Sequence, residues 1–189
     1  MKKINGLSFY RRRKKINSSH VKEFFSWLFG GLAAIFIAMV LNLFFGTTTE
    51  VVGVSMEPTL YNGQTIFINT FIYVLSTPKE GDVVVFLPNG NEKAHYYVKR
   101  VIGLPGETIE IKDNNIYIDG EMLEEKYETT EIEDMGYLTE EMVLEYFVLG
   151  DDRGNSEDSR HAEVGNVKRM YIYGKAWFVI SGENIGFVK

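Results

Sequence analysis

The sequence of 189 residues predicts a mostly β protein, in which a single N-terminal transmembrane helix precedes an all-β domain of barrel-like or sandwich-like form. Residues 24–45 carry no charged side chain, and short β-like runs follow them, broken by turn residues about every ten positions. A small acidic excursion interrupts these runs at residues 121–145. We expect a basic tail at residues 1–23, an anchor at 24–45 and a folded domain at 46–189.

The apolar run of residues 24–45 is predicted to span a membrane. Its 22 residues would extend roughly 33 Å at ~1.5 Å per residue, enough for a hydrocarbon core of ~30 Å. A buried helix of a soluble protein would show a polar stripe, and here only Ser26 and Asn42 are polar. A cleaved signal peptide usually has an apolar stretch of only ~7–15 residues before a small-x-small site. This run is longer and ends in Leu43-Phe44-Phe45, which favours an uncleaved anchor.

Charge predicts the orientation of the anchor. Residues 1–23 hold eight basic residues and one acid, a net +7, so the remainder carries −13 of the total of −6. The positive-inside rule places the tail in the cytoplasm and residues 46–189 outside the cell membrane. The basic cluster at residues 11–15 is also expected to contact anionic lipid head groups.

The β-like runs are separated by Asn-Gly, Pro-Gly and Asp-Gly pairs, which are typical of turns. The acidic excursion holds ten acids against one base, Lys126, and is interpreted as a solvated lobe and not as a binding site. The runs predicted as strands are residues 50–54, 65–73, 81–86, 94–102, 108–112, 115–118, 145–149 and 169–180.

Composition excludes several kinds of chemistry. The chain has no cysteine, which excludes disulfides, thiol nucleophiles and thiolate-ligated metal sites. A sequence pI near 5.2 argues against nucleic acid as a partner, because such binding requires neutralisation of phosphates. No metal and no cofactor are expected.

Ser55 is the first candidate for a reactive group. It stands in Gly53-Val-Ser-Met-Glu-Pro-Thr-Leu60, about ten residues beyond the apolar run. Pro58 disfavours helix at Glu57, so the serine is expected on a turn with its hydroxyl and backbone N–H accessible. A serine in a turn is ordinary unless a base accompanies it.

Lys99 is the second candidate. Alternation along its strand places it on the same face as Tyr97 and Val101. Burial there would lower the pKa of its amine and free a lone pair for general-base catalysis. A snorkelling or edge-strand lysine is the alternative, which the strand pattern alone favours.

A polar cluster at residues 150–160, Gly-Asp-Asp-Arg-Gly-Asn-Ser-Glu-Asp-Ser-Arg, is the third candidate. It could be a plain turn, or it could hold a buried amine and a nucleophile in place. A calcium loop is disfavoured because Arg153 stands at a ligand position of the usual pattern. The following His161 could form a Ser–His–Asp triad with Ser55, although no spacing requires one.

Together, the anchor, Ser55-Met-Glu-Pro-Thr-Leu60, Lys99-Arg-Val-Ile-Gly-Leu-Pro-Gly-Glu107 and the cluster at 150–160 closely resemble bacterial type I signal peptidases, in the same order. The resemblance covers nearly the whole chain from Phe24 onward. A single span and a short acidic excursion are similar to the compact Gram-positive form of this Ser/Lys peptidase family.

The resemblance implies an activity and a set of site residues. Ser55 would be the nucleophile and Lys99 the general base of a membrane-bound serine endopeptidase. Its substrates would be secreted preproteins, cut after a small-x-small sequence. The oxyanion hole would rest mainly on backbone N–H groups, because Gly53 stands where some relatives carry a serine. Ser156 matches a serine that would orient the lysine through a hydrogen bond. Asp158 and Arg160 match a supporting acid and base near the site. Asp151 and Arg153 match further positions with a structural role.

Two other functions remain open from the residues alone. A membrane-tethered β-domain could bind a partner or calcium through its acidic lobe, without a reactive serine. A self-cleaving Ser–Lys peptidase would need a small-x-small site between the span and Ser55, and no persuasive one is present.

Overall fold

A computed structural model describes residues 18–45, 47–133, 137–138, 144–182 and 184–189. Most of the expected basic tail and part of the acidic excursion lie outside the described residues. The chain separates into two compact units, one ending at Leu41 and the other formed by Asn42–Lys189.

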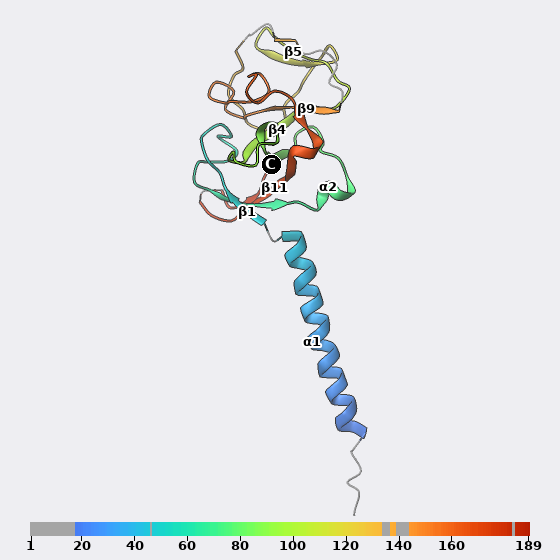
Figure 1. Cartoon of the computed structure of the whole chain (residues 1–189). Helices are drawn as coiled ribbons and strands as arrows, with labels where there is room; N and C mark the ends of the chain where they lie inside the picture. Colours follow the sequence, from blue (N-terminus) through green and yellow to red (C-terminus); the bar gives the residue numbers. More distant parts are fainter. Residues whose placement is uncertain (1–17, 46, 134–136, 139–143, 183) are drawn as a thin grey trace, which may run out of the picture. The chain divides into compact units, whose positions relative to one another are not determined.

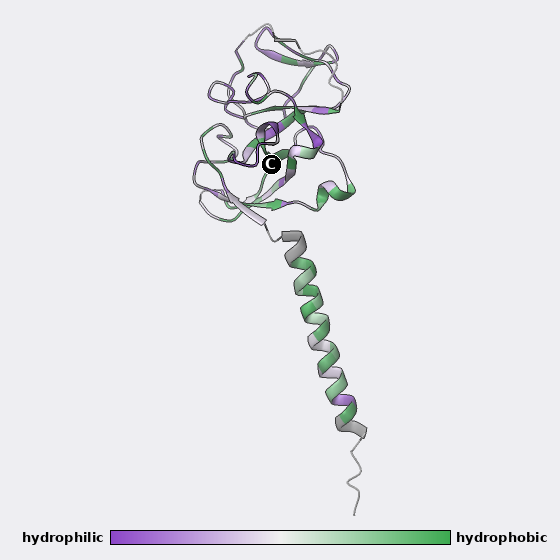
Figure 2. Cartoon of the chain, viewed as in Figure 1, coloured by the Kyte–Doolittle hydropathy of each residue, from purple (hydrophilic) through white to green (hydrophobic). Residues whose placement is uncertain are grey.

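Helix α1 (Ser18–Phe45) contains the predicted membrane segment. Among the described residues, its stretch Val21–Leu41 is the one helix long and apolar enough to cross a membrane, and no part of it is buried by other residues. Trp27 is 83% exposed, and Figure 2 shows apolar residues along almost the whole described helix. A helix that is apolar all round is stable in lipid, where its backbone groups are paired within the helix.

The second unit is built from antiparallel strands, as Figure 1 shows. Within the described residues they form a curled eight-stranded sheet and a four-stranded sheet. The larger sheet has the order β1 (Thr47–Glu50), β2 (Thr65–Asn69), β11 (Ile172–Val179), β3 (Val83–Phe86), β4 (Tyr97–Gly103), β9 (Glu145–Leu149) and β10 (Val167–Lys168), with β12 (Gly186–Phe187) on β11. The smaller sheet has the order β7 (Glu121–Met122), β6 (Asn115–Ile118), β5 (Ile109–Lys112) and β8 (Tyr137–Leu138). The short helices of this unit are α2 (Ile72–Leu75), η1 (Pro88–Gly90) and η2 (Arg169–Tyr171).

The core explains why these runs form strands. All four residues of β3 are buried, as are six of the seven residues of β4, so both strands are covered on their two faces. Isoleucines of β5 pack with Phe147 and Leu149 of β9 in one buried cluster, which joins the two sheets. β-Branched and aromatic side chains suit such packed, pleated surfaces. The predicted mostly β class with one N-terminal apolar helix is confirmed.

Several predicted strand boundaries are wrong: the run of residues 94–102 becomes a strand only at Tyr97, and residues 169–171 of the last run form η2. Two further errors have clear local reasons. The first strand occupies Thr47–Glu50 and not residues 50–54, because Gly53 has a φ of +92° and begins a turn. The second ends at Asn69 and not at residue 73, because the chain turns there: the Asn69 side chain accepts a hydrogen bond of 3.0 Å from the Ile72 N–H, and α2 begins at Ile72.

Candidate active site

The turn after β1 presents Ser55 at the edge of the core. Met56 and Leu60 are fully buried in the cluster formed by β2, β3 and β11, and they anchor the turn on both sides of the serine. Backbone hydrogen bonds from Glu57 to Val54 (2.9 Å) and from Leu60 to Met56 (2.8 Å) close it. Ser55 itself is half-buried, so its hydroxyl is held in place and remains reachable.

Strand β4 places Lys99 inside the domain. The strand pairs with β3 on one side, where Lys99 faces Val84, and with β9 on the other. Only 4% of Lys99 is exposed. The alternative of an edge-strand or snorkelling lysine is therefore wrong, since β4 is an interior strand and the side chain does not reach bulk solvent.

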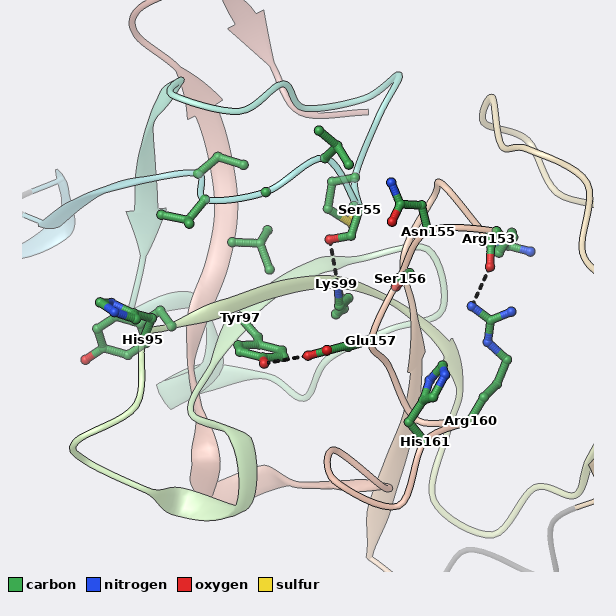
Figure 3. A pocket seen from close by; sticks show the side chains of 18 of the residues that line it. Ser55, His95, Tyr97, Lys99, Arg153, Asn155, Ser156, Glu157, Arg160 and His161 are labelled. Atoms are coloured by element: carbon green, nitrogen blue, oxygen red, sulfur yellow. Dashed lines mark hydrogen bonds between the residues drawn. The ribbon is translucent and has the colours of Figure 1, made fainter.

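Ser55 and Lys99 meet directly, as Figure 3 shows. Lys99 Nζ donates a hydrogen bond of 2.6 Å to Ser55 Oγ. Burial lowers the pKa of Lys99 to about 8, although the carboxylates of Asp158 and Glu157 oppose that shift. Roughly one amine in ten is then neutral at pH 7, compared with far fewer for an ordinary lysine. The neutral amine can accept the serine proton along the same contact.

The loop of residues 150–160 supports this pair through buried charges. Asp158 is fully buried and accepts two hydrogen bonds of 2.8 Å from the Arg160 guanidinium and one of 3.1 Å from the Gly150 N–H. Burial alone would raise the pKa of Asp158, but Arg160 and these hydrogen bonds hold it below its ordinary value. Asp158 therefore stays ionised near the lysine.

A second buried ion pair fixes the strand that carries the lysine. Arg100 is fully buried, and its Nε and Nη2 donate to the two carboxylate oxygens of Asp151 at 2.8 and 2.6 Å. Its guanidinium also lies 3.8 Å from the centre of the Tyr127 ring and donates to the Gly81 carbonyl at 2.9 Å. The pair ties β4 to the start of the loop of residues 150–160.

The sequence of this chain matches known proteins over most of its length. The family model described as signal peptidase, peptidase S26, matches residues 24–181. A signal peptidase I P of Bacillus subtilis subsp. natto is 36% identical over 160 residues, which cover 79% of this chain and 82% of the relative. The chain belongs to the signal peptidase family. A signal peptidase I of Bacillus licheniformis is 34% identical over 165 residues, covering 82% and 87% of the two chains. A crystal structure of a signal peptidase I from Enterococcus faecalis is 33% identical, with a TM-score of 0.41, and covers 56% of this chain and 98% of that one.

Membership of the signal peptidase family makes the chain a serine peptidase, and hence a hydrolase. The Ser55–Lys99 contact lies in a cleft of about 740 Å³. Its walls come from the turn of Ser55, the start of β4 and the loop of residues 150–160.

Gly53 and Ser156, both predicted near the site, line this cleft. The positive φ of Gly53 strains any other residue there, so the glycine serves the backbone path to Ser55, although a side chain would meet open space. Ser156 Oγ is buried and, among the described residues, meets strict hydrogen-bond geometry with no partner, but it is near enough to Asp158 to help lower the pKa of that carboxyl. The structure thus places Ser156 in the same cleft as Lys99 without a hydrogen bond between the two side chains.

His161 stands at the border of the cleft. Its Nδ1 lies 3.9 Å from Asp158 Oδ1, and 45% of its side chain is exposed. The hydrogen bond to Ser55 Oγ comes from Lys99. The geometry therefore favours the lysine over a histidine as the base. Within the described residues, no group of three or more carboxylate or imidazole side chains is arranged to hold a metal ion.

Two contacts of the site were not found from the sequence. Tyr97 O–H donates a hydrogen bond of 3.1 Å to Glu157 Oε2 beside the lysine (Figure 3). Alternation had placed Tyr97 on the face of Lys99, but nothing distinguished Glu157. The second contact is the ion pair between Arg153 and Glu125. Glu125 is one of ten acids in the excursion, and no local pattern marked it.

Proposed function

We propose that the chain removes signal peptides from exported preproteins as a membrane-anchored serine endopeptidase with a Ser55–Lys99 dyad. The observation that carries the proposal is the 2.6 Å contact between Ser55 Oγ and Nζ of the buried Lys99. A base that is partly neutral near physiological pH, in contact with a hydroxyl, is the arrangement that activates a serine. Family membership supplies the substrate class.

The reaction proceeds in two halves. Neutral Lys99 takes the Ser55 proton while Oγ bonds to the carbonyl carbon of the last residue in a small-x-small sequence. Backbone donors, chiefly the Ser55 N–H, stabilise the oxyanion, and such donors are each typically worth ~2.7–4 kcal/mol. The C–N bond then breaks, and the lysine ammonium protonates the departing amine of the mature protein. Lys99 then removes a proton from water as the oxygen adds to the acyl carbon; the bond from that carbon to Ser55 Oγ breaks, the lysine returns the proton to Oγ, and the signal peptide is released.

Asp158 and Arg160 support this chemistry without contacting the substrate carbonyl. The Asp158 carboxylate stabilises the lysine ammonium formed in each half-reaction, while Arg160 acts in the opposite direction on Lys99 and holds Asp158 in its ionised form. Ser156 and Gly53 complete the walls around the dyad. No metal or cofactor takes part in the proposed reaction.

The proposal includes a location. Helix α1 anchors the chain in the cell membrane, with the N-terminus in the cytoplasm and the peptidase domain outside. The excess of basic residues before the helix supports this orientation. The substrate's own apolar segment lies in the same bilayer, so the dyad needs to act only a short distance beyond it.

The test is cleavage of one preprotein by the purified full-length chain. Ser55→Ala should abolish cleavage, and Lys99→Ala should reduce kcat by at least ~100-fold, the usual contribution of a general base. His161→Ala should cleave at close to the wild-type rate. Mass spectrometry of the products should locate the cut after a small-x-small sequence. Substantial cleavage by the Lys99 variant, or a large loss with His161→Ala alone, would contradict the dyad.

A further inference from the structure

Part of the acidic excursion lies along the loop of residues 150–160. The Thr130 N–H donates a hydrogen bond of 3.0 Å to the Asp151 carbonyl, and Thr130 Oγ1 accepts one of 2.6 Å from the Arg153 N–H. Two of the loop's backbone groups are therefore paired with a segment that is separated from it by about twenty residues of sequence. This part of the excursion is attached to the site and is not a free solvated lobe.

Glu125 supplies the counter-ion for Arg153. The two terminal nitrogens of the Arg153 guanidinium, Nη1 and Nη2, contact the two carboxylate oxygens of Glu125, with Nη1 at 3.0 Å from Oε2. Only 1% of the Arg153 side chain and 19% of the Glu125 side chain are exposed. A buried guanidinium without its carboxylate is strongly destabilising, because its charge has lost water and gained no partner. Arg153 can therefore stay buried because Glu125 is present.

Arg153 belongs to a closed ring of hydrogen bonds. Its Nε donates to the Gly150 carbonyl at 2.9 Å, and its own carbonyl accepts from Arg160 Nη2 at 2.7 Å. Arg160 holds Asp158, and Asp158 accepts the Gly150 N–H at 3.1 Å, which closes the ring. Gly150 is thus fixed through both its N–H and its carbonyl.

Gly150 lies against the backbone of Ser55 and the side chain of Ser156. A methyl group added at Gly150 would lie 2.4 Å from the Ser55 carbonyl oxygen and 2.3 Å from Ser156 Oγ. The Asp152 N–H also donates to the Ser55 carbonyl at 3.1 Å. A small shift of the ring would therefore be transmitted to the backbone of Ser55 by direct contact.

We propose that Glu125 and Thr130 form a positioning clamp, which holds Arg153 and through it keeps Gly150 and residues 151–160 in register with Ser55. This inference rests on the proposed peptidase function and assigns a role to residues of the acidic excursion. Both are positioning residues, since neither lines the cleft. Glu124 and Glu128 belong to the same excursion and are exposed, so they are matched controls.

The experiment measures kcat, KM and the pH–rate profile of the full-length protein on one preprotein. Glu125→Gln should lower kcat at least ~10-fold with little change in KM, since misplacement of reacting groups by about 1 Å can cost 10²-fold. Glu125→Asp should restore part of the loss because it keeps the charge. The ascending limb of the profile should move to lower pH in Glu125→Gln, because displacement of Asp158 weakens the field that raises the pKa of Lys99. Glu124→Gln and Glu128→Gln should match the wild type.

The outcomes separate this inference from the proposed function. If the wild type does not cleave the preprotein, or Ser55→Ala cleaves it equally well, the proposed function fails. If the wild type cleaves and Glu125→Gln shows the kcat and pH profile of Glu124→Gln, the clamp is refuted, even if its melting temperature is lower. Should Glu125→Gln not fold, Thr130→Val decides the question, because it removes the hydroxyl that pairs with Arg153 and leaves the charges intact. Reduced kcat in that folded variant supports the clamp, and unchanged kcat overturns it.

Discussion

Single residues around Lys99 set the electrostatics of the cleft. Burial is the largest influence on the pKa of the amine and lowers it, while the carboxylates of Asp158 and Glu157 act in the opposite direction. Asp158 is paired with Arg160, whereas Glu157 is exposed and bonded to the neutral Tyr97 hydroxyl. Removal of the Glu157 charge should therefore change the lysine's protonation without dismantling an ion pair.

Glu157→Gln should move the ascending limb of the pH–rate profile to lower pH. The amide removes a negative charge that stabilises the ammonium, so the pKa of Lys99 falls further below its ordinary value and more of the amine is neutral at pH 7. The shift should be roughly a few tenths of a pH unit, because Glu157 is exposed and its field is screened. Steady-state kinetics between pH 6 and about 10 would measure it. Glu163→Gln, outside the cleft, should leave the limb in place, and a shift of the Glu157 variant to higher pH would contradict the argument.

The resemblance to type I signal peptidases, and not local spacing, predicted the proposed pair of Ser55 and Lys99. Local pattern left Ser55 as an ordinary turn residue and favoured a snorkelling or edge-strand position for Lys99. The burial of Lys99 depends on β3 and β9 lying on either side of β4, which is a long-range property. Glu125 could not be distinguished from the other nine acids of the excursion, because its partner Arg153 is 28 residues away in the sequence and the pairing is also a long-range property.

At the scale of elements, the predicted strands follow local patterns where packing agrees with them. The runs at residues 115–118 and 145–149 coincide with β6 and β9, where β-branched and aromatic side chains enter the core. The predictions failed where a single polar or glycine residue redirects the chain, as at Gly53 and Asn69. The junction between β9 and the loop that follows it depends on another such glycine, Gly150.

Gly150→Ala should destabilise the fold and reduce activity. Its new methyl group would overlap the Ser55 carbonyl and Ser156 Oγ, and forced overpacking of this kind typically costs ~1–3 kcal/mol. Urea unfolding would give the change in the free energy of unfolding, and preprotein cleavage would give the change in kcat. Gly154→Ala in the same loop has no atom within 4 Å of its new methyl group and should behave like the wild type. Equal stability and activity of the two variants would show that the loop can relax away from Ser55.

At the scale of the whole molecule, the net charge of −6 is a sum over two sides of a membrane in the proposed topology. The +7 of residues 1–23 and the −13 of the remainder lie on either side of the uncharged stretch of residues 24–45 in helix α1. Moving the tail across a bilayer would require transfer of a concentrated positive charge, so the asymmetry favours one orientation. The absence of cysteine also means that any thiol introduced into the chain would be the sole target for labelling.

Single-cysteine variants should report the orientation directly. Lys93→Cys, at an exposed position of the domain, should react with a membrane-impermeant maleimide added to intact cells. Ser8→Cys in the basic tail should react only after the cells are lysed, because the positive-inside rule keeps the tail in the cytoplasm. Replacement of the basic residues at positions 11–15 by glutamine should make a fraction of Ser8→Cys chains reactive from outside. Labelling is read by mass shift on a gel, and cleavage of a preprotein by each variant confirms that the domain is folded. Labelling of Ser8→Cys but not Lys93→Cys in intact cells would reverse the proposed topology.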